Sequence, residues 1–176
     1  MSNKNVDELE QYYDGESDEW VDASSVGYPE SIGNFLIKFS SFENSIDKWV
    51  ADGISDRSHH QGYHVLQLLK TSNKIDLLER MTLLMLTHFK PDMRVEFKEI
   101  ISNMRSLNSF RNKIVHANWI SLRNNGDVQT RVSIDKDEGF VQFEKTNITP
   151  KIIDQSIDKM ENLMESLDGF FERLHE

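Results

Sequence analysis

The chain has 176 residues, of which 38% are hydrophobic, and a formal net charge of −10. This length is enough for one domain with a substantial core, and no apolar run approaches the roughly 20 residues that a membrane span needs. The sequence contains no cysteine, which excludes disulfides and thiolate metal sites. Because the start of the chain is acidic and polar, unlike a signal peptide, we expect a cytoplasmic protein that does not contact a membrane.

The negative charge is concentrated near the N-terminus. Residues 1–30 contain nine acidic residues and one lysine, a net charge of −8, so the rest of the chain carries only −2. Residues 101–123 contain four basic residues and no acidic one. Since the charges are segregated, the overall balance does not exclude an anionic ligand such as a nucleic acid.

The sequence divides into residues 1–27, predicted to be an acidic and poorly ordered arm, and residues 28–176, predicted to be one helical domain. The arm is either a solubilising tail or an acidic peptide that occupies a basic groove or recruits a partner. Eight acidic residues and one lysine give it a net charge of −7. We expect the arm to compete weakly with RNA for the basic region at residues 101–123, or to be the segment that an inhibitor binds.

Five helices are predicted from the apolar periodicity. Their expected bounds are residues 29–53, 58–70, 74–89, 91–117 and 150–171. Pro29 suits a first helical turn, and Thr149-Pro150 is a good cap for the last helix. The third helix, capped by Asn73, is apolar almost all round, which predicts a place at the centre of the core.

Between residues 119 and 145 the apolar pattern changes from a helical to an alternating period, which is typical of short strands. Three strands are expected at residues 119–122, 128–134 and 140–143. Asn124-Asn125-Gly126 and Asp137-Glu138-Gly139 are good hairpin turns between them. The predicted fold is therefore mainly α, a helical bundle of about five helices with a small antiparallel β-meander before the last helix.

The segment from Arg111 to His116 lies near the end of the fourth predicted helix. Arg111 falls where the apolar stripe of that helix calls for another apolar side chain, and a guanidinium is costly to bury without a partner. It either pairs with an internal carboxylate such as Glu79 or Glu96, or this face meets an anion. A neighbouring row at helical spacing adds further donors and one imidazole: Arg105, Ser109, Asn112 and His116.

Arg111, Asn112 and His116 form an Arg-Asn-x-x-x-His pattern that resembles the Arg-x4-6-His motif of HEPN superfamily ribonucleases. The resemblance covers six residues, together with the long helices before and after them. It implies a metal-independent endoribonuclease that needs no cofactor and acts as a toxin or antiviral-defence effector, with the motif helices of two protomers meeting in a homodimer. The alternative is a catalytically inactive HEPN-like protein that binds a protein or RNA partner.

RNA cleaves itself when its 2′-hydroxyl is deprotonated, its leaving 5′-oxygen is protonated and the phosphorane charge is neutralised. His116 suits the proton transfers, Arg111 offers planar donors for phosphate oxygens, and Asn112 can orient the imidazole or bind phosphate. The expected substrate-binding residues are Arg105, Lys113 and Trp119. Trp119 would stack on a base, unless it only anchors the first strand.

Two further features limit what the resemblance implies. Some HEPN toxins extend the motif to Arg-x4-His-x-Tyr, and a partner nucleotidyltransferase modifies the Tyr. Asn118 stands at that position here, so an inhibitor or antitoxin protein is expected to act in another way. His59, His60 and His64 include a spacing that can hold zinc, but no acid accompanies them in an HExxH arrangement, so no metal site is expected.

Overall fold

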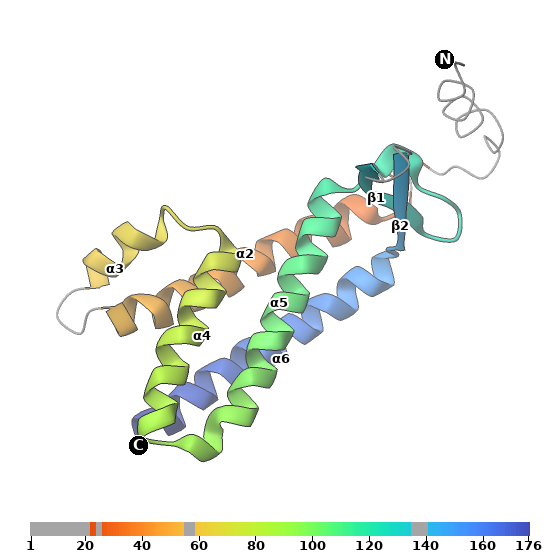
Figure 1. Cartoon of the computed structure of the whole chain (residues 1–176). Coiled ribbons are helices and arrows are strands. Elements are labelled where there is room, and N and C mark those ends of the chain that lie inside the picture. The colour runs from red at the N-terminus through yellow and green to blue at the C-terminus, as the bar shows by residue number, and fades with distance from the viewer. Residues whose placement is uncertain (1–21, 24–25, 55–58, 135–140) are drawn as a thin grey trace.

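The computed structural model describes residues 22–23, 26–54, 59–134 and 141–176. In these ranges the chain is mainly helical, with five α-helices and a two-stranded antiparallel sheet before the last one, which confirms the predicted fold class (Figure 1). The elements are α2 (Tyr28–Ile54), α3 (His59–Leu66), α4 (Thr71–His88), η3 (Pro91–Met93), α5 (Arg94–His116), η4 (Trp119–Ser121), β1 (Asp127–Ile134), β2 (Val141–Asn147) and α6 (Pro150–His175). Most of the predicted arm lies outside the described residues.

Local signals explain where α6 and α4 begin. Thr149 caps α6 as predicted, because its hydroxyl oxygen accepts a hydrogen bond from the Ile152 N–H at 3.3 Å. The predicted cap at Asn73 is wrong, because α4 begins at Thr71 with Lys70 as its N-cap. The N–H of Asn73 already donates to the Lys70 carbonyl inside the first turn.

The predicted three-stranded meander is a two-stranded hairpin, with the 3₁₀ turn η4 in place of the first strand. The hydroxyl and the N–H of Ser121 both donate to the Asn118 carbonyl, and such local bonds compete with strand pairing. An isolated bridge between Asn118 and Gln129 connects this segment to β1, and the Gln129 N–H also donates to the Ser121 hydroxyl. The other two strands are confirmed as β1 and β2.

The first predicted turn forms, but it joins η4 to β1 rather than two strands. Gly126 has a φ of 85°, which favours glycine, and its N–H donates to the Arg123 carbonyl. A side chain at this position would collide with the Thr149 methyl group, 2.5 Å from a Cβ. The second predicted turn, residues 137–139, lies outside the described residues.

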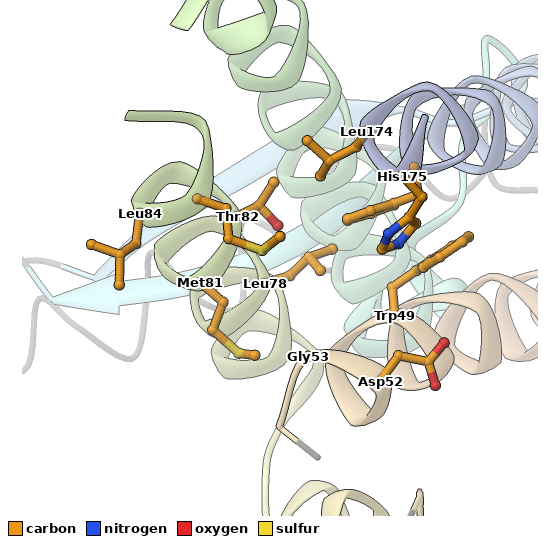
Figure 2. Close-up of a pocket in the computed structure, with 11 residues that line it drawn as sticks. Trp49, Asp52, Gly53, Leu78, Met81, Thr82, Leu84, Leu174 and His175 are labelled. Atoms are coloured by element: carbon orange, nitrogen blue, oxygen red, sulfur yellow. The ribbon is translucent and has the colours of Figure 1, made fainter. Parts of the chain in front are cut away.

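The helix α4 lies at the edge of the bundle, so the prediction that it occupies the centre of the core is wrong. Only one face of it is buried, with Ile75, Leu78, Thr82 and Leu86. Leu84 is 65% exposed and Met85 is 43% exposed. These two residues border an apolar hollow of about 410 Å³ between α4 and the C-terminal ends of α2 and α6 (Figure 2).

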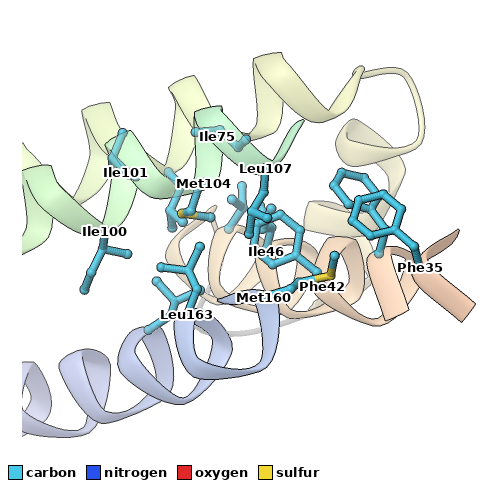
Figure 3. Close-up of a cluster of buried hydrophobic side chains, with 14 of the residues drawn as sticks. Phe35, Phe42, Ile46, Ile75, Ile100, Ile101, Met104, Leu107, Met160 and Leu163 are labelled. Atoms are coloured by element: carbon cyan, nitrogen blue, oxygen red, sulfur yellow. The ribbon is translucent and has the colours of Figure 1, made fainter. Parts of the chain in front are cut away.

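The core lies where α2, α5, α6 and the buried face of α4 meet (Figure 3). The rings of Phe97 in α5 and Phe170 in α6 stack with their centroids 5.0 Å apart. Phe97, Met104 and Ile114 are essentially inaccessible to solvent, so α5 is held along its length. This packing sets the position of the C-terminal end of α5, which points to the hairpin (Figure 1). No helix in the described ranges combines the length and the hydropathy needed to cross a membrane.

Candidate functional site

His116 is the last residue of α5, and its exposed side chain lies between two polar hollows. The α4 hollow, about 500 Å³, is lined by Glu43, Leu69, Lys70, Thr71, Ser72, Asn108, Arg111, Asn112 and His116. The hairpin hollow, about 350 Å³, is lined by Ser109, Asn112, Lys113, His116, Thr130, Arg131 and Glu144. Asn112 and His116 line both hollows because they are four residues apart on one helix face.

Arg111 lines the α4 hollow, and no carboxylate in the described part of the chain pairs with it. Its Cζ lies 5.8 Å from the centroid of the Phe39 ring, a cation–π contact that holds the guanidinium against α2. Nη1 donates to the side-chain oxygen of Asn112 at 3.2 Å. The buried Nε has no acceptor within the described ranges. An unsatisfied buried donor costs about 1–3 kcal/mol. Because solvent does not reach Nε, an anion in the hollow would bind Arg111 through its terminal nitrogens.

The two carboxylates expected as internal partners of Arg111 are engaged elsewhere. Glu79 binds Nη2 of Arg105 at 2.7 Å. Glu96 binds Arg173 of α6. Of the two expectations for Arg111, internal pairing with one of these acids is therefore wrong, and a face open to an anion remains.

The structure does not bring Arg105 to the hollows. Its guanidinium is held by Glu79 and Asp76 of α4, each at 2.7 Å, and their hydrogen bonds raise the pKa of Arg105. Two carboxylates already neutralise this side chain, which does not favour the expected substrate-binding role of Arg105; that role stays a prediction.

Trp119 anchors the turn after α5 and lines neither hollow. Its indole N–H donates to the Ile114 carbonyl at 3.1 Å, and its ring lies against Tyr28, with centroids 5.4 Å apart. Of the two roles expected for Trp119, the contacts favour the anchor over base stacking. Lys113 lines the hairpin hollow, where its Nζ donates to Glu144, and its substrate-binding role stays a prediction.

The sequence did not point to the hollow residues that lie outside α5. Glu43 of α2 accepts a hydrogen bond from the Thr71 hydroxyl at the start of α4. Lys70 precedes that helix, and Arg131 belongs to β1. Glu43 lies one helical turn after Phe39, which contacts Arg111, so the same face of α2 supports the guanidinium and brings this carboxylate to the hollow. No local pattern links these positions, because only the packing of separate elements brings them together.

Two other features contribute no chemistry to the site. His60 and His64 are exposed on α3, and in the part of the chain that the structure describes no three His, Cys, Asp or Glu residues are grouped to hold a metal ion. The apolar hollow of Figure 2 shares no residue with the two polar hollows. It is lined largely by apolar side chains, including the stacked rings of Trp49 and Phe171, 4.3 Å apart.

No protein-family model, curated protein or solved structure matches the chain. The chemistry of the site therefore follows from its own residues. The α4 hollow combines a guanidinium (Arg111), an imidazole (His116), an amide (Asn112) and a carboxylate (Glu43). This set can bind a phosphate group and transfer protons to and from it.

Proposed function

We propose that the protein is a metal-independent endoribonuclease of HEPN type that acts in the cytoplasm as a toxin or antiviral-defence effector. The observation that carries this proposal is the state of Arg111, which shares a hollow with His116 and pairs with no carboxylate among the described residues. An RNA phosphate supplies the negative charge and the acceptor oxygens that this guanidinium lacks.

In the proposed reaction, the 2′-oxygen of a ribose attacks the neighbouring phosphorus while the bond from phosphorus to the 5′-oxygen breaks. Arg111 donates to the non-bridging oxygens, where negative charge grows in the transition state. His116 either removes the proton of the 2′-hydroxyl or protonates the leaving 5′-oxygen. The products are a 2′,3′-cyclic phosphate and a 5′-hydroxyl. No metal ion and no cofactor takes part.

The reaction needs a second proton-transfer group, because one imidazole cannot be acid and base in the same step. We propose that a homodimer joins the ends of two α5 helices, so that two copies of His116 share the work. Glu43 is the alternative within one chain, since it lines the same hollow as His116. Light scattering at micromolar protein concentration tests the dimer. If the protein is a monomer and still cleaves RNA, Glu43 is the second proton-transfer group. Glu43→Gln should then slow cleavage about 100-fold.

The experiment that tests the function measures cleavage of an RNA strand in the presence of EDTA. The expected product ends in a 2′,3′-cyclic phosphate, and His116→Ala should slow its formation by at least about 100-fold. His88→Ala is the matched control, because His88 is exposed on α4 and lines neither hollow. Cleavage that persists in His116→Ala, or that EDTA abolishes, would contradict the mechanism. RNA binding without cleavage would support the alternative, an inactive HEPN-like interaction protein.

The proposed toxin role has a separate test in cells. Expression of the chain should arrest growth, and His116→Ala should remove the arrest while leaving protein levels unchanged. A toxin of this kind needs an inhibitor or antitoxin protein. Because Asn118 stands where some HEPN toxins carry the modified tyrosine, that protein is expected to act by binding rather than by modifying this position.

A further inference from the structure

The hairpin is irregular where it faces α5. The pairing register shifts between Gln129 and Arg131, so Thr130 has no partner of its own on β2. Neighbouring side chains of a regular strand point to opposite faces of the sheet, whereas a β-bulge re-aims a side chain. Thr130 and Arg131 are adjacent in the strand, and both line the hairpin hollow. The bulge therefore lets two successive residues of β1 line the hollow that His116 also lines.

Contacts with α5 hold the bulged part of the hairpin in place. Lys113 Nζ donates to Glu144 Oε1 at 3.1 Å and to the Thr146 hydroxyl at 3.3 Å. The hydroxyls of Thr130 and Thr146 are 2.9 Å apart, so Thr130 belongs to the same network. Arg131 is exposed beside this network. Glu144 lies directly opposite it on β2, but in the described ranges no carboxylate forms an ion pair with Arg131.

The two hollows meet at Asn112 and His116, which line both of them. Each hollow has an arginine without an ion pair among the described residues: Arg111, with Lys70 in the same hollow, on the α4 side and Arg131 on the hairpin side. Successive phosphates of an RNA strand are one nucleotide apart. Because the hollows share Asn112 and His116, a strand whose phosphate binds beside Arg111 can continue past His116 into the hairpin hollow, which Arg131 lines.

We propose that the hairpin hollow is a second phosphate subsite, in which Arg131 binds the phosphate next to the one that is cleaved. This inference rests on the proposed ribonuclease function and names its substrate class, an RNA strand with at least two phosphates. Arg131 is a binding residue that does not touch the reacting atoms. Glu144 lowers the affinity of the subsite, because its carboxylate holds Lys113 and repels a phosphate.

The test compares three substrates: a dinucleoside monophosphate, and the same molecule with an added phosphate at its 5′ end or at its 3′ end. One added phosphate should lower KM about tenfold, the scale of a hydrogen-bonded charge pair. Arg131→Gln should remove this gain, so that KM no longer depends on the added phosphate. Glu144→Gln should enlarge the gain. If neither phosphate lowers KM, or if the gain survives in Arg131→Gln, the subsite does not exist.

The matched control is Arg80→Gln, which removes an exposed arginine of α4 that lines neither hollow. It should keep the full gain. Arg131→Lys should keep part of the gain, since lysine retains the charge but not the planar pair of donors. Equal melting temperatures of Arg131→Gln and the wild type would show that the variant is folded.

The same series of ligands, made with 2′-deoxyribose so that it cannot be cleaved, separates the subsite from the proposed activity. Binding is measured by fluorescence anisotropy at low salt, where exposed charges are least screened. A gain that depends on the added phosphate and on Arg131, in a protein that cleaves no RNA, would support the subsite and reject the ribonuclease. Cleavage of RNA with no such gain would reject the subsite alone.

Discussion

Two regions of α5 differ in how their arginines are paired. Arg105, in the middle of the helix, is bound by Asp76 and Glu79 of α4, each at 2.7 Å. Arg111, less than two turns later, contacts an aromatic ring and an amide oxygen, and its Nε has no acceptor among the described residues. The acids of α4 therefore neutralise Arg105 and leave Arg111 without an ion pair among the described residues.

The course of α4 along α5 explains this difference. Where α4 faces Arg105, it presents two acidic side chains. The N-terminal end of α4 lies near Arg111. There Lys70 and Thr71, rather than acidic residues of α4, border the hollow. The start of a helix carries a partial positive charge, so it favours an anion between itself and Arg111. The carboxylate of Glu43 is present in this hollow, but it accepts its hydrogen bond from Thr71.

The largest expected effect is a difference in kcat/KM between variants of the two arginines. Arg111→Ala should lower kcat/KM for RNA cleavage by about 100-fold or more, since it removes the group that neutralises charge in the transition state. Arg105→Ala should change kcat/KM less than about threefold, because its guanidinium is already satisfied by surface ion pairs. Steady-state kinetics on one RNA substrate measures both. A loss of similar size in the two variants would refute the contrast between the two regions.

A smaller effect is expected on the free energy of unfolding. Here the substitution of Arg105, not that of Arg111, should be the harmful one. Arg111→Met replaces a buried donor that lacks an acceptor, so the free energy of unfolding should stay unchanged or rise by about 1 kcal/mol. Arg105→Met should lower it by up to about 1 kcal/mol, because Asp76 and Glu79 lose their shared cation. Urea unfolding of both variants makes the comparison. If Arg111→Met proves the less stable of the two, its guanidinium has a structural role that outweighs the unsatisfied Nε.

The smallest expected effect concerns the acidic arm. Ala23 packs against the core and Tyr28 contacts Trp119, so the chain enters the domain at the end that carries the hollows. Deleting residues 1–21, which keeps these contacts, should strengthen RNA binding by about two- to fivefold at low salt, and the gain should vanish as salt rises.

An arm of the same length in which asparagine and glutamine replace the acids is the matched control, and it should bind RNA as tightly as the deletion. If the full chain and the deletion variant bind RNA with the same affinity at every salt concentration, the arm is only a solubilising tail.

The sequence by itself determined the helices and the identity of the motif residues. Apolar periodicity placed the five helices because it depends on neighbours within a few turns. Thr149 marked the start of α6 and Gly126 a turn, since a cap and a positive φ are properties of single residues. For the same reason Arg111 and His116 could be placed near the end of a helix without knowledge of its partners.

Only the tertiary structure decided which charges are open and which residues complete the site. The sequence offered both Arg105 and Arg111 as ligand-binding candidates, and the structure pairs the acids of α4 with Arg105. Glu43 and Arg131 come from separate elements, so their place beside His116 depends on how α2 and the hairpin pack on α5. Ion pairing and burial depend on contacts between residues far apart in the chain, and no local pattern encodes those contacts.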